Sequence, residues 1–142
     1  MSCSYQIDVD RKLIEVKFSG LVSIDEKIDC DRQIIDDPRY QQGMSAVWDI
    51  TAATFNWNLA DIDRLRVYVR GIRERVGRSF WAVVVGESPA DFTAKLFSLL
   101  HEAYDTIIII QLFRSQTDAL AWLESQAQPE RGLSRPDFGT ES

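Results

Sequence analysis

The sequence predicts an α/β fold in which strands and amphipathic helices alternate along 142 residues. Apolar side chains recur at every second position near the N-terminus, which is typical of half-buried strands. Further along the chain they recur at steps of three and four, which is typical of helices. The expected element order is β-β-α-β-α-β-α-β-α. Right-handed crossovers then predict an N-terminal antiparallel hairpin plus three parallel strands, with the helices packed on the sheet.

The N-terminal hairpin is predicted from two alternating segments on either side of a polar turn. Residues 5–9 and 14–19 each alternate apolar with polar side chains, and the turn between them is Asp-Arg-Lys at residues 10–12. Such a hairpin buries one face and leaves the other in water. Gly20 is expected to end the second strand.

Two helices with a short strand between them follow the hairpin. Ser23 and Glu26 have the spacing of a capping box at the start of the first helix. The strand is predicted at residues 45–50, and Asn58 is expected to cap the second helix, with Asp61 adding negative charge to its first turn. The apolar stripe of the second helix comprises Leu59, Ile62, Leu65, Val69, Ile72 and Val76.

The second half of the chain predicts two strands and two helices. A continuous apolar run gives a strand at residues 80–86, and Ser88 is the expected N-cap of a helix at 89–104. Residues 106–113 are β-branched in their first half, so this strand is expected to be central in the sheet and covered on both faces. Ser115 has capping spacing before a last, short helix.

A single domain is expected over residues 1–127, followed by a Pro/Gly/Ser-rich C-terminal tail over residues 128–142. The formal net charge of −6 disfavours binding to nucleic acid or anionic lipid. No membrane span is expected, because no apolar stretch reaches the necessary length, and the N-terminus lacks a signal-peptide pattern. These features predict a cytoplasmic protein.

The two cysteines, Cys3 and Cys30, are widely separated and form no CxxC pair. Neither a disulfide framework nor a zinc or other metal site is therefore expected. Cys30 lies between Asp29 and Asp31, whose negative charges disfavour the thiolate that a nucleophile requires. We interpret Cys30 as a small residue of the first helix.

Three segments, together with the element order, resemble the STAS and SpoIIAA-like superfamily. They are IEVKFSGLVSIDE at 14–26, AVWDITAATF at 46–55 and LFRSQTDALAWLE at 112–124. The resemblance spans residues 5–127 and implies a SpoIIAA/STAS-like mixed sheet. The SpoIIAA-like group is distantly grouped with CRAL-TRIO lipid-transfer folds, which implies a small apolar or lipid-like ligand as one alternative.

The resemblance also implies the position of a regulatory site. In anti-sigma-factor antagonists of this superfamily, a strand that ends in Asp leads to a DSxG-type motif whose serine is phosphorylated at a helix start. Asp49 matches the strand end, but the segment NWNLAD at residues 56–61 contains neither serine nor glycine. Asn58 and Asp61 occupy the helix start, and the charge of Asp61 would repel a phosphate. A phosphoserine switch is therefore not expected here.

The candidate binding site is the loop predicted at residues 51–58, because ligands of open α/β sheets bind at the carboxyl ends of the parallel strands. Phe55 and Trp57 are placed either to contact a partner or to close over the core. The candidate residues for ligand or partner binding are Asp49, Thr51, Thr54, Phe55, Trp57 and Asn58. Phe92 and Leu96 are candidates for an adjoining pocket.

A possible anion-binding ridge comprises Arg66, Arg70 and Arg73, which share helical spacing on the second helix. The alternative is a solvated face paired with the acidic helix at residues 23–37. The helix at 89–104 is apolar around more than half its girth, which implies burial between layers, an oligomer interface or a ligand tunnel. An oligomer interface is the commonest of these in a small domain, so a homodimer is expected.

No motif of a known catalytic site is present. His101 is the only histidine, and the sequence contains no GxSxG, GxxxxGK[ST], GxGxxG or HExxH segment. We therefore expect a non-catalytic binding module without a cofactor, whose role is protein–protein interaction or regulation without the phosphoserine switch. A carrier or sensor of a small apolar or lipid-like ligand is the alternative.

Overall fold

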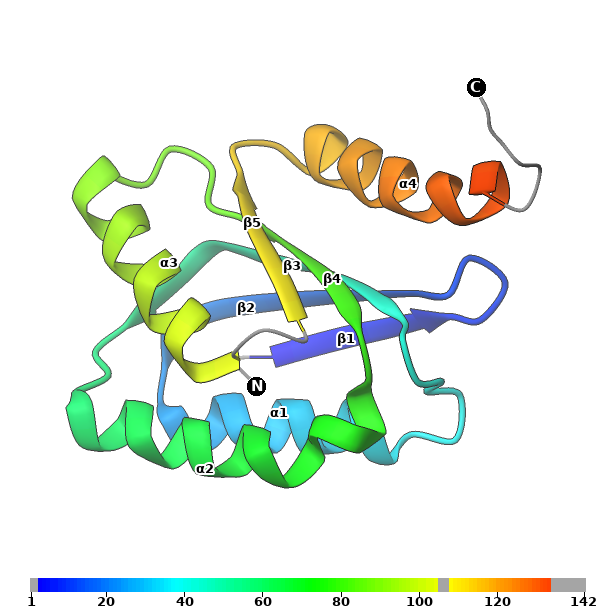
Figure 1. Cartoon of the computed structure of the whole chain (residues 1–142). Coiled ribbons are helices and arrows are strands. Elements are labelled where there is room, and N and C mark those ends of the chain that lie inside the picture. Colours follow the sequence, from blue (N-terminus) through cyan, green and yellow to red (C-terminus); the bar gives the residue numbers. More distant parts are fainter. Residues whose placement is uncertain (1–2, 105–107, 134–142) are drawn as a thin grey trace.

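The computed structural model describes residues 3–104 and 108–133, in which five strands form one mixed sheet in the order β1-β2-β3-β4-β5. β1 is antiparallel to β2, and each later strand is parallel to the one before it. The predicted α/β class and element order are confirmed (Figure 1). The strands are β1 (Cys3–Asp8), β2 (Leu13–Val22), β3 (Ser45–Phe55), β4 (Ser79–Val84) and β5 (Ile108–Phe113). The helices are α1 (Ile24–Asp36), α2 (Leu59–Val76), α3 (Ala90–Tyr104) and α4 (Gln116–Leu133).

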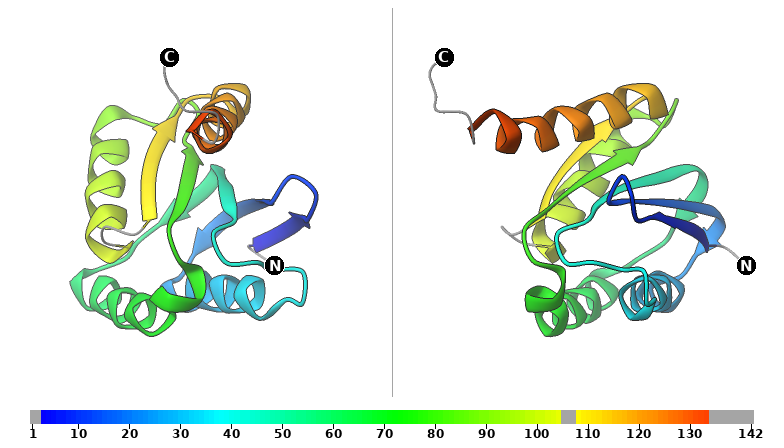
Figure 2. Two further views of the ribbon diagram at one scale, coloured as in Figure 1. Left: turned by 45° about the vertical axis from the view of Figure 1, so that its right-hand side comes forward. Right: turned by 90° about the vertical axis from the view of Figure 1, so that its right-hand side faces the viewer.

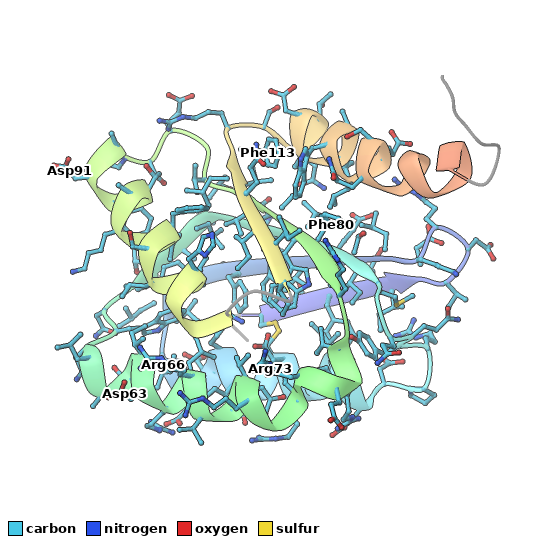
Figure 3. The ribbon with its side chains drawn as sticks, in the orientation of Figure 1. Asp63, Arg66, Arg73, Phe80, Asp91 and Phe113 are labelled. Atoms are coloured by element: carbon cyan, nitrogen blue, oxygen red, sulfur yellow. A yellow bond between two sulfur atoms is a disulfide. The ribbon has the colours of Figure 1, made fainter. Side chains whose placement is uncertain are left out.

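Helices cover the two faces of the sheet unequally. α1 and α2 lie side by side along one face with α3 next to them, whereas α4 alone lies across the other face (Figures 1 and 2). The main core lies under α1–α3, around residues such as Phe18, Trp48 and Leu65. A smaller core joins α4 to β3 and β4, where Phe80 and Phe113 pack against Trp122 (Figure 3).

β2 and β3 are both longer than predicted. β2 does not end at Gly20 but continues to Val22, with one register shift relative to β3. β3 continues to Phe55, because the extension of β2 supplies hydrogen-bond partners beyond the point where β4 ends. The predicted loop at 51–58 is therefore mostly strand, and only residues 56–58 connect β3 to α2.

The prediction that the strand at 106–113 is central is wrong. β5 pairs only with β4 and forms an edge of the sheet, whereas β3 is the central strand. Ile108 and Ile110 enter the main core, but Ile109 and Gln111 on the other face are exposed. The β-branched run therefore reflects one fully buried face, not two. Residues 106 and 107 lie outside the described residues.

Helix starts follow the predicted caps with one exception. The capping box at Ser23 is present in α1, Asn58 caps α2 in the same way, and the Ser115 hydroxyl accepts from a backbone N–H of α4 at 3.2 Å. Ser88 is not the N-cap residue of α3, because the helix begins at Ala90; the Ser88 hydroxyl donates to the carbonyl oxygen of Val85 at 2.7 Å.

The last helix is longer than predicted. α4 continues past residue 127 to Leu133, so the expected boundary between domain and tail falls inside this helix. Residues 134–142 lie outside the described residues, and the division of the chain at 127 stays a prediction.

The prediction of no disulfide is wrong. Cys3 of β1 and Cys30 of α1 form a disulfide, with their Cα atoms 6.5 Å apart (Figure 3). Their distance in sequence hid the contact, which arises because α1 packs on the face of β1 that carries Cys3. Both thiols are used in this bond, so neither is available as a nucleophile or as a thiolate metal ligand.

Candidate functional site

The predicted polar site residues are held by local hydrogen bonds, and Asp49 lies within β3 and not at its end as predicted. Asp49 Oδ1 accepts hydrogen bonds from the backbone N and the hydroxyl of Thr51, at 3.0 and 2.7 Å. Asn58 Oδ1 accepts from the backbone N of Asp61 at 2.8 Å, and the Asp61 carboxylate accepts from the backbone N of Asn58 at 3.0 Å. A carboxylate therefore already occupies the helix start where a phosphate would be stabilised.

Phe55 and Trp57 form a half-buried aromatic cluster with Phe92 of α3. The ring centroids of Phe55 and Trp57 are 4.8 Å apart, and those of Phe55 and Phe92 are 6.4 Å apart. Trp57 Nε1 donates to the carbonyl oxygen of Val22 at 3.0 Å. These contacts tie the connection between β3 and α2 to β2 and to α3, and they close the main core at this end of the sheet.

A cavity of about 30 Å³ lies beneath the aromatic cluster. Of the predicted pocket residues, Leu96 lines it together with Phe55 and Trp57, whereas Phe92 packs on Phe55. This volume is about that of one water molecule. The cavity is lined by Phe18, Lys27, Trp48, Ile50, Phe55, Trp57, Trp81, Val83, Leu96, Leu100 and Ile110.

A buried ion pair next to this cavity was missed by the sequence analysis. Lys27 and Asp31 of α1 are both buried, and Lys27 Nζ lies 2.9 and 2.8 Å from the two carboxylate oxygens of Asp31. Lys27 Nζ also lies 4.1 Å from the ring centroid of Trp48. Burial lowers the pKa of Lys27, and the charge of Asp31 opposes this effect. The sequence feature that indicates this buried pair is the i, i+4 spacing of Lys27 and Asp31 within the apolar stripe of α1.

Trp48 of β3 connects this cavity to a second one. Its side chain is stacked on Phe18, with centroids 5.4 Å apart, and it contacts Trp81. Trp48 and Trp81 also line a smaller cavity of about 20 Å³, which Asp31 and Tyr40 border. Trp48 is only 5% exposed, and its Nε1 has no hydrogen-bond partner among the described residues. A buried donor without a partner is rare enough to need an explanation.

Two leucines are exposed at the same end of the sheet as the aromatic cluster. Leu21 of β2 is 60% exposed and Leu59, the first residue of α2, is 80% exposed. The hydrogen bond from Trp57 to Val22 brings the residue after Leu21 into contact with the connection that leads to Leu59. Leu21 points to the opposite face of the sheet from Phe55, because Phe55 pairs with Val22 in the register. We call this end of the sheet, with Leu21, Phe55, Trp57 and Leu59, the junction surface. Thr54, which is opposite Leu21 in the register, is exposed beside it.

Ion pairs between α1 and α2 support the alternative interpretation of the arginine-rich helix. Arg64 pairs with Asp25, and Arg75 Nη2 lies 2.9 Å from Asp36 Oδ1. Both acidic partners belong to α1. Two arginines that flank the predicted ridge therefore serve to hold the two helices together.

The three residues of the predicted ridge differ in their surroundings. Arg66 is half-buried and its Nη1 lies 3.2 Å from Asp63 Oδ1 on the same helix. Arg73 is also half-buried, whereas Arg70 is exposed. Arg66 and Arg73 are marked along α2 in Figure 3. The ridge thus presents one exposed guanidinium between two partly covered ones, and anion binding there stays a prediction.

Within the described ranges, no group of three or more His, Cys, Asp or Glu side chains is placed to hold a metal ion. None of the helices in residues 3–104 and 108–133 combines the length and the apolar character that crossing a bilayer requires.

The raised pKa of Tyr40, at the edge of the second cavity, predicts a loss of stability at high pH. Burial raises its pKa to about 12, and Arg75 partly offsets the effect. The unfolded chain releases this proton near pH 10, so stability is unaffected below about pH 10 and falls as the pH rises toward 12. Because Tyr40 is partly exposed, we expect Tyr40→Phe to remove only about 1 kcal/mol of this loss. Urea unfolding of the wild type and of Tyr40→Phe, at about pH 9 and about pH 11, measures how much stability each protein loses between the two pH values. If the free energy of unfolding fell equally with pH in both proteins, Tyr40 would not be the group that causes the loss.

The comparisons with known proteins concern the fold. No protein-family model matches the sequence, and no curated protein matches it. One similar solved structure is an uncharacterized protein from the DUF3478 family, with a SpoIIAA-like fold, from Shewanella loihica PV-4. Its TM-score is 0.56 at 17% identity, over 86% of this chain and 94% of that chain. Another is the anti-sigma factor antagonist SpoIIAA in its unphosphorylated form, with a TM-score of 0.42 at 12% identity, over 91% of this chain and 99% of that chain. The first comparison confirms the predicted SpoIIAA-like fold.

Proposed function

Because the chain has a SpoIIAA-like fold, we propose that it is a non-catalytic module that binds a partner protein through the junction surface. The observation that carries this proposal is the exposure of Leu21 and Leu59 at the same end of the sheet as two half-buried aromatic rings. Aromatic side chains in partly formed pockets are frequent anchors of protein interfaces, and neighbouring apolar residues exclude water around them.

The same site supports regulation without a phosphate switch. The Asp61 carboxylate accepts the hydrogen bond of the Asn58 backbone N–H, and its charge lies in the first turn of α2. Any anion that approached this helix start would meet that charge. Binding at the junction surface therefore relies on apolar contacts and not on phosphate recognition.

Leu59→Asp is expected to abolish capture of the partner without unfolding the domain. Leu59 is 80% exposed, so the substitution removes little buried area, and Asp is favourable in the first turn of a helix. A charge in the centre of an apolar interface is costly to desolvate. The measurement is affinity capture with wild-type and variant baits, followed by mass spectrometry of the bound proteins.

Val67→Asp is the matched control, because Val67 is 65% exposed on the same helix but lies on the groove between α1 and α2. We expect one partner that the wild type and Val67→Asp capture and Leu59→Asp does not. If Leu59→Asp captures the same proteins as Val67→Asp, the junction surface is not the binding site.

A second candidate function is a carrier or sensor of a small apolar ligand. The cavity beneath Phe55 and Trp57 favours it, because these two side chains lie both at the surface of the domain and in the cavity wall. At about 30 Å³ the cavity admits no lipid chain, so ligand entry requires the aromatic cluster to move outward. Native mass spectrometry of the purified protein tests for a retained ligand.

A homodimer is proposed from the apolar character of α3. Besides its buried residues Leu96 and Leu100, this helix carries half-buried Phe97 and Leu99. The same native spectrum counts the copies of the chain. A mass of two chains supports the dimer, and a single chain at micromolar concentration contradicts it.

A further inference from the structure

β3 has an unpaired edge where it extends beyond β4. β4 pairs with β3 only as far as Val84, which lies opposite Asp49, whereas β2 pairs with β3 as far as Phe55. Past Asp49 the loop after β4 leads away to α3, while β3 continues toward α2 (Figure 1). Residues 52–55 therefore have a neighbouring strand on one side only.

The backbone of this unpaired edge presents hydrogen-bonding groups. Successive residues of a strand direct their N–H and C=O groups alternately to its two sides, so every second residue of 52–55 directs them away from β2. Among the residues that the structure describes, no backbone hydrogen bond joins 52–55 to any segment other than β2. The N–H of Thr51 is bonded to the Asp49 carboxylate, so the free edge begins at Ala52.

α3 does not pack along this edge. Its main contacts are with α2 and β5, and its Phe92 ring stacks on Phe55. Ala52 and Thr54, which belong to the unpaired segment, are both exposed. The edge is therefore accessible to another chain.

The sequence of the edge favours pairing with a further strand. Natural proteins protect free edges with lysine, proline, inward charges or bulges, but residues 52–55 read AATF and contain neither a charge nor a proline. The β2 side of the same ribbon is less suitable, because Gly20 has a φ of +71°, which breaks the extended conformation there. Of the two sides of this ribbon, the β3 side is therefore the regular one.

We propose that the partner of the junction surface contributes an extended, uncharged segment that pairs with residues 52–55 and continues the sheet where β4 has ended. The proposal rests on the proposed function and names how the partner's backbone binds. In strand addition the main-chain hydrogen bonds supply affinity, and alternate side chains supply specificity. An apolar side chain of the segment would lie beside Phe55 on one face, and a small or polar one would lie beside Thr54 on the other.

The probe for this site is a phage-displayed library of random nine-residue peptides, selected on the full chain. We expect enriched peptides to alternate apolar with polar residues and to lack a central proline. N-methylation of a synthetic copy, one residue at a time, is expected to weaken binding at least tenfold at every second position and to leave the positions between unchanged. Hydrogen exchange of the amides in residues 52–55 is expected to slow when the peptide binds.

Equal effects of N-methylation at neighbouring positions, with unchanged exchange at 52–55, would overturn strand addition but leave the junction surface as a site for side-chain contacts. Failure to enrich any peptide would also overturn strand addition, whereas the proposed function is decided separately by capture with Leu59→Asp. If exchange at 52–55 slows in the free chain as its concentration rises, a second copy occupies the edge and the partner segment is wrong.

Discussion

Lys27→Met is expected to lower the free energy of unfolding by about 3–5 kcal/mol. The substitution keeps most of the apolar stem but removes the ammonium that lies 2.8 Å from Asp31, so the buried carboxylate loses the positive charge of Lys27. Removing one member of a buried ion pair is strongly destabilising. Urea unfolding monitored by tryptophan fluorescence measures the difference.

The double variant Lys27→Met/Asp31→Leu is the control for this effect. Replacing both members of a buried ion pair by apolar residues of similar volume is often neutral or stabilising, so we expect it to recover most of the stability that Lys27→Met loses. The strong non-additivity of the two substitutions identifies the pair as coupled. If Lys27→Met is as stable as the wild type, the pair is not buried in solution.

Cys3→Ala is expected to lower the free energy of unfolding by about 3–4 kcal/mol under oxidising conditions, because the disulfide closes a loop across a sequence separation of 27 residues. The bond restricts the unfolded chain and ties the edge strand β1 to α1. Cys3 is half-buried, so the truncation itself removes little packing. Thermal unfolding of the wild type with and without dithiothreitol provides the comparison.

Reduced wild type and Cys3→Ala are expected to unfold at the same temperature, and dithiothreitol is expected to leave the variant unchanged. Should oxidised wild type and Cys3→Ala unfold together, the two cysteines are not bonded in solution.

The element order was predictable because hydrophobic periodicity reports which face of each element is buried. α2 shows this well: Ile62, Leu65 and Val69 recur at helical spacing, and Asn58 caps the helix as expected. Helical spacing and capping depend only on residues close in sequence, so they can be recognised before the fold is known.

Features that depend on distant partners were not predictable. β3 reaches Phe55 only because the extension of β2 lies alongside it, and the sequence of residues 51–55 alone resembles a loop. The position of β5 at the sheet edge is a matter of strand order, which composition does not encode: Ile109 is as β-branched as its buried neighbours but is exposed. The Cys3–Cys30 disulfide depends in the same way on the packing of α1 against β1.

The candidate site was predicted in part. Phe55 and Trp57 were predicted as binding residues because they are aromatic residues near a predicted strand end. The structure brings them together with Leu96 around one cavity. Leu21 was missed because it lies beyond Gly20, where the strand was predicted to end, and Leu59 was missed because it was assigned to the buried apolar stripe of the second helix. Their exposure is visible only once the register and the helix orientation are known. Lys27 was missed because its charge favours a surface position.

Binding through the junction surface is tested most directly by the affinity of the captured partner for three purified forms of the domain: wild type, Leu59→Asp and Val67→Asp. Isothermal titration calorimetry measures each dissociation constant, and circular dichroism checks that all three are folded. The wild type and Val67→Asp are expected to bind equally well, and Leu59→Asp about thirtyfold or more weakly, as for an interface hot spot. Equal affinity of all three forms would contradict a partner site at Leu21, Phe55, Trp57 and Leu59.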